Sequence, residues 1–365
     1  MKKIRLFLIY GIIGVLCIAA LTGFIINWSR NSGTAEIAVA KSTPIPTGTA
    51  EIAAAESTPI ATGTADIAAA KSTPIPTGTP EEPLVGIAQG DDYAATTKKA
   101  IENAGGLGGI ITKDCTVLIK PNICKEDKPG SPTITDYRVV EEVVKEVKEL
   151  GAAKVIVAEG PISGLAFTRD INGYQNLKDV EFVEFNKMSK EDCYEVKPEN
   201  SVTGKSFFIP KIYMDADVVI GVPKLKTHFQ PDAYVSLCLK NLFGVAPGRI
   251  YGGAERDSLH NLGLMQTIVD LNLIRKPDFQ VVDGIVGGEG YGPINNTPVD
   301  SKIILAGVDP VAVDMVGLTF MGFTEDQVLV VRMAANKGVG VDDLSKIKVV
   351  GADLDKIKMK FSKKR

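Results

Sequence analysis

The sequence predicts an α/β protein with a mainly parallel sheet, flanking helices and a single N-terminal transmembrane helix. Two observations predict the sheet: short apolar runs alternate with helical patterns over residues 84–361, and polar residues follow several of these runs. A third observation, a long uncharged apolar run before residue 29, predicts the membrane helix. Alternating strands and helices favour a parallel sheet, and the loops at the carboxyl ends of its strands hold the functional groups of α/β proteins.

We divide the 365-residue chain into four segments on the basis of composition. A transmembrane signal-anchor spans 1–28, a low-complexity linker spans 29–83, the α/β domain spans 84–361, and a basic tail spans 362–365. The net charge of −3 gives no reason to expect a nucleic-acid partner.

The first segment predicts a helix that stays in the membrane. Leu6–Trp28 holds 23 residues without a charge, which suffices to cross a hydrocarbon layer of about 30 Å. Lys2, Lys3 and Arg5 precede this run, so the positive-inside rule places the rest of the chain outside the cytoplasm. The alternative is a cleaved signal peptide, although the run is longer than the apolar region of such peptides.

The linker consists of a repeated unit of 15 residues, which begins at Gly33, recurs at Gly48 and Gly63, and starts again at Gly78. Each unit joins an alanine-rich piece to a proline-containing piece. Such units hold too few bulky apolar residues to bury a core, and we therefore interpret them as a semi-rigid spacer.

The first part of the domain predicts a β-α-β unit. An apolar strand is expected at 115–120, followed by a helix that Thr135 or Asp136 caps and that ends before Gly151. The next strand is expected at 154–158. Two such strands joined by a helix run parallel.

The rest of the domain continues this alternation. Further strands are expected at 180–185, 206–209, 216–222, 278–282, 302–306 and 346–350. Helices are expected at 93–104, 235–243, 258–274, 310–321 and 325–336, with Asp309 as the cap of the helix that Pro310 begins. A β-rich insertion is expected within 180–210.

Five short motifs occur in a fixed order along the domain: Ile-Lys120-Pro-Asn122, Pro-Lys224-Leu-Lys226-Thr-His228, Ser236-Leu-Cys-Leu-Lys240-Asn241-Leu-Phe-Gly244, Val282-Asp283-Gly284 and Gly307-Val-Asp309-Pro-Val-Ala-Val-Asp314. Their joint pattern resembles the uncharacterised family catalogued as domain of unknown function 362, over nearly all of 84–350. The resemblance implies an α/β domain, which in other members is often joined to ferredoxin-type iron–sulfur modules, and it implies no reaction. The five cysteines of this chain show no cluster spacing, so no iron–sulfur cluster is expected.

Lys224, Lys226, Thr227 and His228 directly follow the strand predicted at 216–222. Lysine and threonine donate hydrogen bonds to anions, and histidine can move protons near neutral pH. We interpret this segment as a loop that binds a small anionic substrate or cofactor, with Lys226 and His228 catalytic. A solvated polar loop without such a role is the alternative.

Other polar residues are expected to face the same site. Lys240 and Asn241 lie in an apolar helical run, where a lysine needs a carboxylate, a ligand anion or a path to solvent. Lys120 and Asn122 close the first strand of the β-α-β unit. Glu159 closes the second, and it is a candidate general base.

A glycine-rich stretch that includes Asp283, Gly287 and Gly288 follows the strand predicted at 278–282. Glycines let the backbone approach closely and expose N–H groups to an anion, so we group these three residues with the ligand-binding ones. A mobile surface loop is the alternative.

The candidate ligands of a divalent metal are His228, His260 and Asp314. The two histidines have no fixed spacing. Asp314 lies among apolar residues of a predicted helix, where Lys240 or Lys120 would also serve as its partner.

These features predict a membrane-tethered enzyme outside the cytoplasm that acts on a small anionic substrate or cofactor. Proton transfer or a cofactor-assisted redox step, with a redox partner protein, would both fit. The alternative is a non-catalytic extracytoplasmic protein that binds an anionic ligand. The sequence names neither the reaction nor the substrate.

Overall fold

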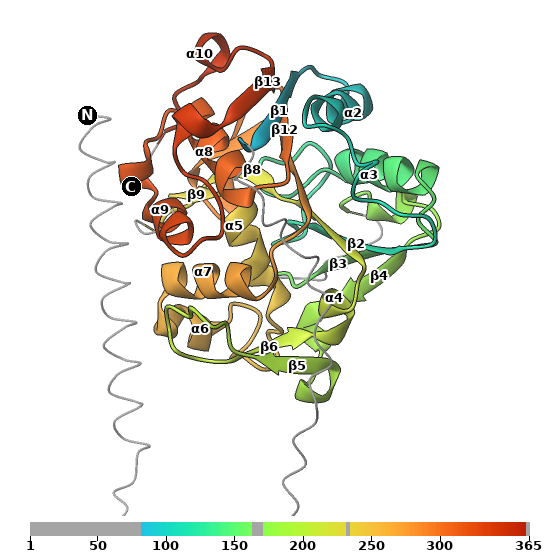
Figure 1. Cartoon of the computed structure of the whole chain (residues 1–365), viewed down its shortest axis with the longest axis vertical. Helices are drawn as coiled ribbons and strands as arrows, with labels where there is room; N and C mark the ends of the chain where they lie inside the picture. Colours follow the sequence, from blue (N-terminus) through green and yellow to red (C-terminus); the bar gives the residue numbers. More distant parts are fainter. Residues whose placement is uncertain (1–81, 163–170, 231–233, 363–365) are drawn as a thin grey trace, which may run out of the picture. The chain divides into compact units, whose positions relative to one another are not determined.

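A computed structural model of the chain describes residues 82–162, 171–230 and 234–362 (Figure 1). The predicted signal-anchor, nearly all of the predicted linker and residues 363–365 of the predicted tail lie outside these ranges. Within them, no helix has both the length and the apolar character that crossing a bilayer requires.

Eight strands follow one another across the main sheet, in the order β13-β1-β12-β10-β7-β2-β3-β4. Their bounds are β1 Leu84–Gln89, β2 Thr116–Pro121, β3 Lys154–Glu159, β4 Glu181–Glu184, β7 Val218–Val222, β10 Phe279–Tyr291, β12 Ile303–Gly307 and β13 Lys348–Gly351. β12 pairs antiparallel with β1 and β10, whereas every other neighbouring pair in this order is parallel. The prediction of a mainly parallel sheet is confirmed.

Three short strands extend the sheet beside β10. They are β8 Lys224–Thr227, β9 Val235–Ser236 and β11 Asn295–Val299. β8 runs parallel to β10 and antiparallel to β9, and β11 pairs antiparallel with β10.

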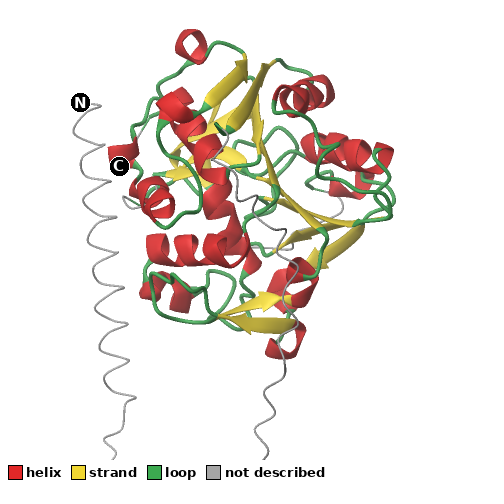
Figure 2. Ribbon diagram, viewed as in Figure 1, coloured by secondary structure: helices red, strands yellow, loops and turns green. Residues whose placement is uncertain are grey.

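Helices cover both faces of the sheet (Figures 1 and 2). The α-helices are α2 Tyr93–Asn103, α3 Tyr137–Glu149, α4 Lys211–Met214, α5 Cys238–Asn241, α6 Asp257–Leu262, α7 Leu264–Arg275, α8 Pro310–Phe320, α9 Leu329–Asn336 and α10 Leu354–Ile357. The 3₁₀ helices are η1 Tyr174–Asn176, η2 Phe185–Lys187, η3 Lys190–Asp192, η5 Leu242–Val245, η6 Glu325–Gln327 and η7 Leu344–Lys346.

Alternating side chains of the strands divide the core into two apolar layers. Val117 and Ile119 of β2 pack into the layer with α2 and α3, whereas Leu118 packs into the layer with α5, α7, α8 and α9. This alternation follows from the two-residue period of a strand, and it explains why the central strands read as continuous apolar runs.

Two predicted helix caps are confirmed. Asp136 accepts a hydrogen bond from the backbone N–H of Arg138 at the start of α3. Asp309 accepts from the N–H groups of Val311 and Ala312 at the start of α8. A cap of this kind contributes about 1 kcal/mol to stability.

The glycine-rich stretch, for which a mobile surface loop is the alternative in the sequence analysis, is a strand. Residues 283–291 continue β10, and their partners are β8, β11 and β12. The glycines serve close packing: a Cβ at Gly288 would collide with the carbonyl of Pro132, and one at Gly284 would lie 2.9 Å from the carbonyl of Ile303. The many glycines of this stretch are explained by the close approach of other backbone segments and not by a turn.

Two other predictions are corrected in their boundaries. The helix expected at 258–274 divides into α6 and α7 at Gly263, which has a φ of 112°. The helix expected at 235–243 becomes β9, the short α5 and a 3₁₀ turn. The β-rich insertion is a separate two-stranded antiparallel sheet of β5 Cys193–Val196 and β6 Phe207–Pro210, whereas β4 belongs to the main sheet.

Candidate functional site

The carboxyl ends of β10, β7, β2 and β3 lie side by side, because these strands are consecutive and parallel in the sheet. Lys120 lies near the end of β2, and Glu159 ends β3. Lys224 begins β8 just after β7 ends, and it pairs in register with Asp283 of β10. The topology therefore brings these predicted residues to one edge of the sheet, as expected for an α/β fold.

Lys120 and Glu159 form a buried ion pair at this edge. Lys120 Nζ lies 2.6 Å from Glu159 Oε2, and the two side chains are 0% and 3% exposed. Lys120 also donates to Asn241 Oδ1 at 3.2 Å, and the Gly160 N–H donates to the other Glu159 oxygen. Burial lowers the pKa of Lys120, against the opposing effect of the Glu159 charge. Glu159 is thus the counter-ion of Lys120, and its predicted role as a base stays a prediction.

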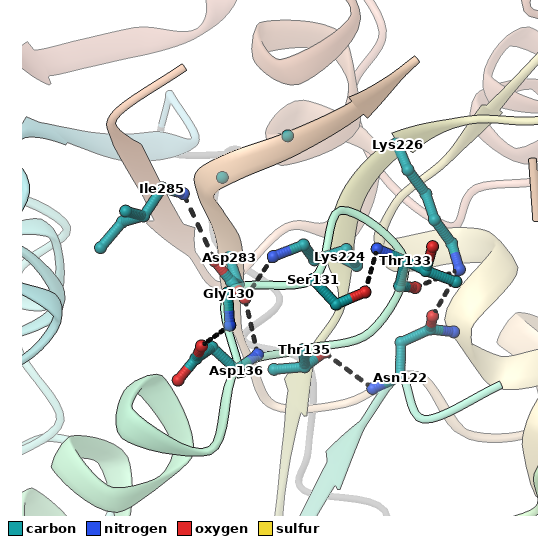
Figure 3. Close-up of polar contacts among 12 residues, drawn as sticks. Asn122, Gly130, Ser131, Thr133, Thr135, Asp136, Lys224, Lys226, Asp283 and Ile285 are labelled. Carbon is teal, nitrogen blue, oxygen red and sulfur yellow. Dashed lines mark hydrogen bonds and ion pairs between the residues drawn. The ribbon is translucent and has the colours of Figure 1, made fainter. Parts of the chain in front are cut away.

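Lys224 and Asp283 form a second buried pair, 2.8 Å apart and both 0% exposed (Figure 3). The backbone N–H of Asp136 donates to the same Asp283 oxygen at 2.8 Å. Burial raises the pKa of Asp283, and the Lys224 charge opposes this rise. The pair connects the start of α3 to β8 and β10. Neither side chain is therefore a solvated polar group on an exposed loop.

Lys226 is completely buried without a carboxylate in contact within the described part of the chain. Four acceptors surround its ammonium nitrogen, and three of them are oxygens: Asn122 Oδ1 at 2.8 Å, the Thr133 carbonyl at 2.7 Å and the Pro293 carbonyl at 2.9 Å. Figure 3 draws Lys226 beside Asn122 and Thr133. The fourth is Cys124 Sγ at 3.3 Å. Burial lowers the pKa of Lys226, against the opposing effects of Cys124 and of the charge of Glu159.

The other polar residues of the predicted loop are also buried and engaged. The Thr227 hydroxyl donates to the Gly290 carbonyl at 3.1 Å. Asn122 accepts from Lys226 through its side chain and donates through its backbone N–H to the Thr135 hydroxyl. The alternative of a solvated loop is therefore wrong, because all four residues of β8 are buried.

Lys240 differs from the other three lysines because its ammonium has neither an ion pair nor a hydrogen bond to the described residues. Its side chain is partly buried, and Nζ lies 5.6 Å from the centroid of the Phe243 ring. Burial lowers the pKa of Lys240 to about 8, and the charge of Lys226 acts in the same direction. Its neighbour Asn241 faces inward and donates to the Lys120 carbonyl at 3.0 Å.

The two histidines lie near Lys240. His228 is 5% exposed and its ring stacks on that of Phe229, with the centroids 5.1 Å apart. Burial lowers the pKa of His228 well below its ordinary value, and the charges of Lys240, Lys226 and His260 add to this effect. His260 contacts the Phe243 ring edge-on, with the centroids 4.8 Å apart. Phe243 thus contacts both Lys240 and His260.

Neutral His228 has a defined donor. Its Nδ1 accepts a hydrogen bond from the Gln230 N–H at 3.2 Å, which assigns the proton of the neutral ring to Nε2. The imidazole can therefore donate one hydrogen bond to an anion without carrying a charge.

Asp314 does not join the histidines. Its carboxylate oxygens accept from the N–H groups of Cys238 and Leu239 at 2.8 and 3.1 Å, so it holds the start of α5 and pairs with neither Lys240 nor Lys120. Burial raises its pKa to about 7. Among the described residues, no three histidine, cysteine or carboxylate side chains gather as a metal site would require, so the candidate ligands His228, His260 and Asp314 do not form such a group.

Gly287 and Gly288, which are predicted to bind an anion through a loop, lie instead in a strand. The Gly287 N–H donates to the Ser301 hydroxyl at 2.8 Å, and Gly288 lies in the ladder between β8 and β11. Both glycines are structural parts of β10.

The sequence does not predict that two further residues, Arg256 and Cys124, lie at this edge. Arg256 is 1% exposed, and its guanidinium donates to carbonyls of Ala246, Ala254 and Gly160 at 2.6–2.8 Å, and to Asn186 Oδ1 at 2.8 Å. Burial lowers its pKa to about 10. Cys124 is buried with its sulfur against Lys226, and nothing in its sequence neighbourhood distinguishes it from the other cysteines.

The fold and this edge define an α/β protein with a cluster of four lysines, Lys120, Lys224, Lys226 and Lys240, at the carboxyl ends of its parallel strands. Residues 117–319 match the family described as Domain of unknown function (DUF362), and every candidate residue of the site falls within this range. The chain belongs to this family, as the sequence motifs predict.

The chain is similar to one named relative, thylakoid-associated protein sll1697 of Synechocystis sp. The two are 31% identical over 256 residues, which are 68% of this chain and 75% of the relative.

Two solved structures are more distantly similar. One is the lactate racemase apoprotein of Thermoanaerobacterium thermosaccharolyticum, with 15% identity, a TM-score of 0.45 and coverage of 67% of this chain and 58% of the racemase chain. The other is a protein of Thermotoga maritima, with 12% identity, a TM-score of 0.39 and coverage of 73% and 62%. This chain thus spans less than two thirds of either structure, and at these TM-scores the likenesses say nothing about activity.

Proposed function

We propose that this protein is a membrane-tethered, extracytoplasmic enzyme that binds a small anionic substrate or cofactor beside Lys240, His228 and His260. One observation carries the proposal: Lys240 is partly buried among other cations and has no counter-ion in the described part of the chain. A buried or half-buried ammonium without a partner is unfavourable, and an anionic ligand would relieve the cost.

The charge balance around Lys240 supports an anion. The carboxylates of this edge are already matched, Glu159 by Lys120 and Asp283 by Lys224. Lys226 and Lys240 add positive charge that no described carboxylate contacts, so the edge as a whole favours a negative ligand.

Two groups are suited to proton transfer at such a ligand. The pKa of Lys240, lowered by burial to about 8, lets it exchange a proton near neutral pH. His228 offers its Nε2–H as a neutral donor. The sequence suggests Lys226 and Glu159 as catalytic residues. In this proposal they would instead influence the electrostatic potential of the site, Lys226 beside Cys124 and Glu159 as the partner of Lys120.

The membrane location in this proposal rests on the apolar run at Leu6–Trp28 and on the basic residues before it. The name of the thylakoid-associated relative supports association with a membrane. The repeated linker would then hold the α/β domain away from the bilayer.

A non-catalytic binding protein is the second candidate, and one observation favours it. Glu159 and Lys226 are buried, and their side chains hydrogen-bond to protein groups, as expected for residues that support a binding site. Mass spectrometry of small molecules retained by the purified full chain, followed by incubation of the retained molecule with fresh protein, separates the two candidates. A product indicates an enzyme, and an unchanged molecule indicates a binding protein.

Calorimetric titration tests the site itself. The full chain in detergent is titrated with inorganic phosphate and with malonate at pH 7, as wild type and as Lys240→Gln. A charge-assisted hydrogen bond contributes about 1.5–3 kcal/mol, so we expect Lys240→Gln to weaken binding about tenfold or more. Lys99→Gln is the matched control, because Lys99 is an exposed lysine of α2 whose ion-pair partner in the described part of the chain is Glu102. Wild-type affinity in Lys240→Gln would overturn the proposal, as would failure of both probes to bind the wild type.

A further inference from the structure

The contact between Cys124 and Lys226 is a feature that the proposed function does not use. Lys226 Nζ lies 3.3 Å from Cys124 Sγ, and the two side chains are 0% and 5% exposed. The four described cysteines 115, 124, 193 and 238 are free thiols, and among them only Cys124 has a lysine nitrogen within hydrogen-bond distance.

The surrounding residues hold Lys226 Nζ and Cys124 Sγ next to each other. Asn122 Oδ1 and the carbonyls of Thr133 and Pro293 accept from Lys226, which keeps the nitrogen beside the sulfur. The sulfur also lies 3.5 Å from the Pro293 carbonyl oxygen and 3.7 Å from that of Thr133. Peroxides oxidise cysteine through its thiolate form and give a sulfenic acid. A buried lysine is also more readily deprotonated than a solvated one, and the free amine is the form that attacks sulfur.

We propose that Cys124 and Lys226 form a redox-controlled covalent link, with hydrogen peroxide as the oxidant. In the first step the thiol and peroxide give a sulfenic acid and one water: the O–O bond breaks, an S–O bond forms, and sulfur supplies the two electrons. In the second step the Lys226 amine attacks the sulfur, the S–O bond breaks, and an S–N bond forms. The hydroxyl leaves with one amine proton as a second water. The product is a sulfenamide, which a thiol reductant returns to the free amine and thiol.

The link would join β8 to the segment that follows β2 and would remove the positive charge of Lys226. Its formation requires the contact between the two residues and the peroxide, and it does not depend on the proposed function.

Peptide mapping of the full chain tests the link. The protein is treated with hydrogen peroxide, digested with trypsin without reductant, and compared with an untreated sample. We expect a cross-linked peptide that joins Cys124 to Lys226, lighter than its two components by two hydrogen atoms. Trypsin should fail to cleave after the linked Lys226, and a thiol reductant before digestion should abolish the cross-linked peptide.

Two further measurements keep the outcome decisive. Dimedone, which traps sulfenic acids, should label Cys124 poorly in the wild type and strongly in Lys226→Gln, because the variant lacks the amine that consumes the sulfenic acid. If that variant fails to fold, dimedone present during oxidation of the wild type should lower the yield of the cross-link. Oxidation of Cys124 to a sulfinic acid or to a disulfide without the link would overturn the proposal. Resistance of Cys124 to peroxide that oxidises Cys193 would do the same.

Discussion

Substitution of Lys120 by methionine should be among the most destabilising single changes at the carboxyl edge of the sheet. Lys120→Met keeps the length of the apolar stem but leaves Glu159, which is 3% exposed, without its counter-ion. It also removes a donor to Asn241 Oδ1. Removing one partner of a buried pair costs about 3–5 kcal/mol, which is a large share of the roughly 5–15 kcal/mol that stabilises a typical domain.

The assay is urea unfolding of the full chain in detergent, followed by circular dichroism at constant pH. The double variant Lys120→Met/Glu159→Gln is the informative comparison, since glutamine is neutral and can still accept from the Gly160 N–H. Replacing a whole buried pair is often neutral, so we expect the double variant to recover more than half of the loss. Lys99→Met, at an exposed pair, is the control and should leave the unfolding midpoint nearly unchanged. A loss below about 1 kcal/mol in Lys120→Met, or no recovery in the double variant, would refute the reasoning.

Three further predictions follow from the same contacts. Burial raises the folded-state pKa of Asp314 to about 7, above the ordinary value of an aspartate, so its contribution to stability is present at low pH and is lost as the pH rises toward 7. Asp314→Asn should remove this part of the pH dependence of the unfolding midpoint, and a variant with the same pH profile as the wild type would contradict the prediction. Binding of malonate should weaken as the pH rises through about 8, where Lys240 loses its proton, and Lys240→Gln should abolish that step in calorimetric titrations. Gly288→Ala should cost about 1–3 kcal/mol, because its Cβ meets the Pro132 carbonyl, whereas Gly109→Ala has open space around it and should unfold like the wild type.

The local elements could be predicted well because their signals lie within a few residues of one another. The apolar stripe and the cap at Asp136 define α3, and Asp309 with Pro310 defines the start of α8. The apolar runs of β2, β3 and β7 indicate strands that are buried on both faces. Such signals depend on short-range geometry, and so they predict the same element whatever tertiary contacts the rest of the chain makes.

The glycine-rich stretch and the residues around Lys240 could not be predicted in the same way. Glycine at 284 and 288 suggests a flexible turn, yet both positions lie in β10 because strands and a loop crowd against the backbone there. Asp314 is likewise ambiguous in sequence, and only the placement of α5 against α8 makes it a partner of two backbone N–H groups. Each of these roles depends on a neighbour that is remote in the chain.

The sequence by itself determined the family, the mainly parallel α/β architecture and the concentration of lysines after the strands. Tertiary structure decided which of those lysines are neutralised. Lys120 and Lys224 meet carboxylates 39 and 59 positions away, Lys226 meets carbonyls and the Cys124 sulfur, and Lys240 meets no described carboxylate. The physical reason is that the energy of a buried charge depends on atoms within a few ångströms, and only the complete fold brings those atoms together.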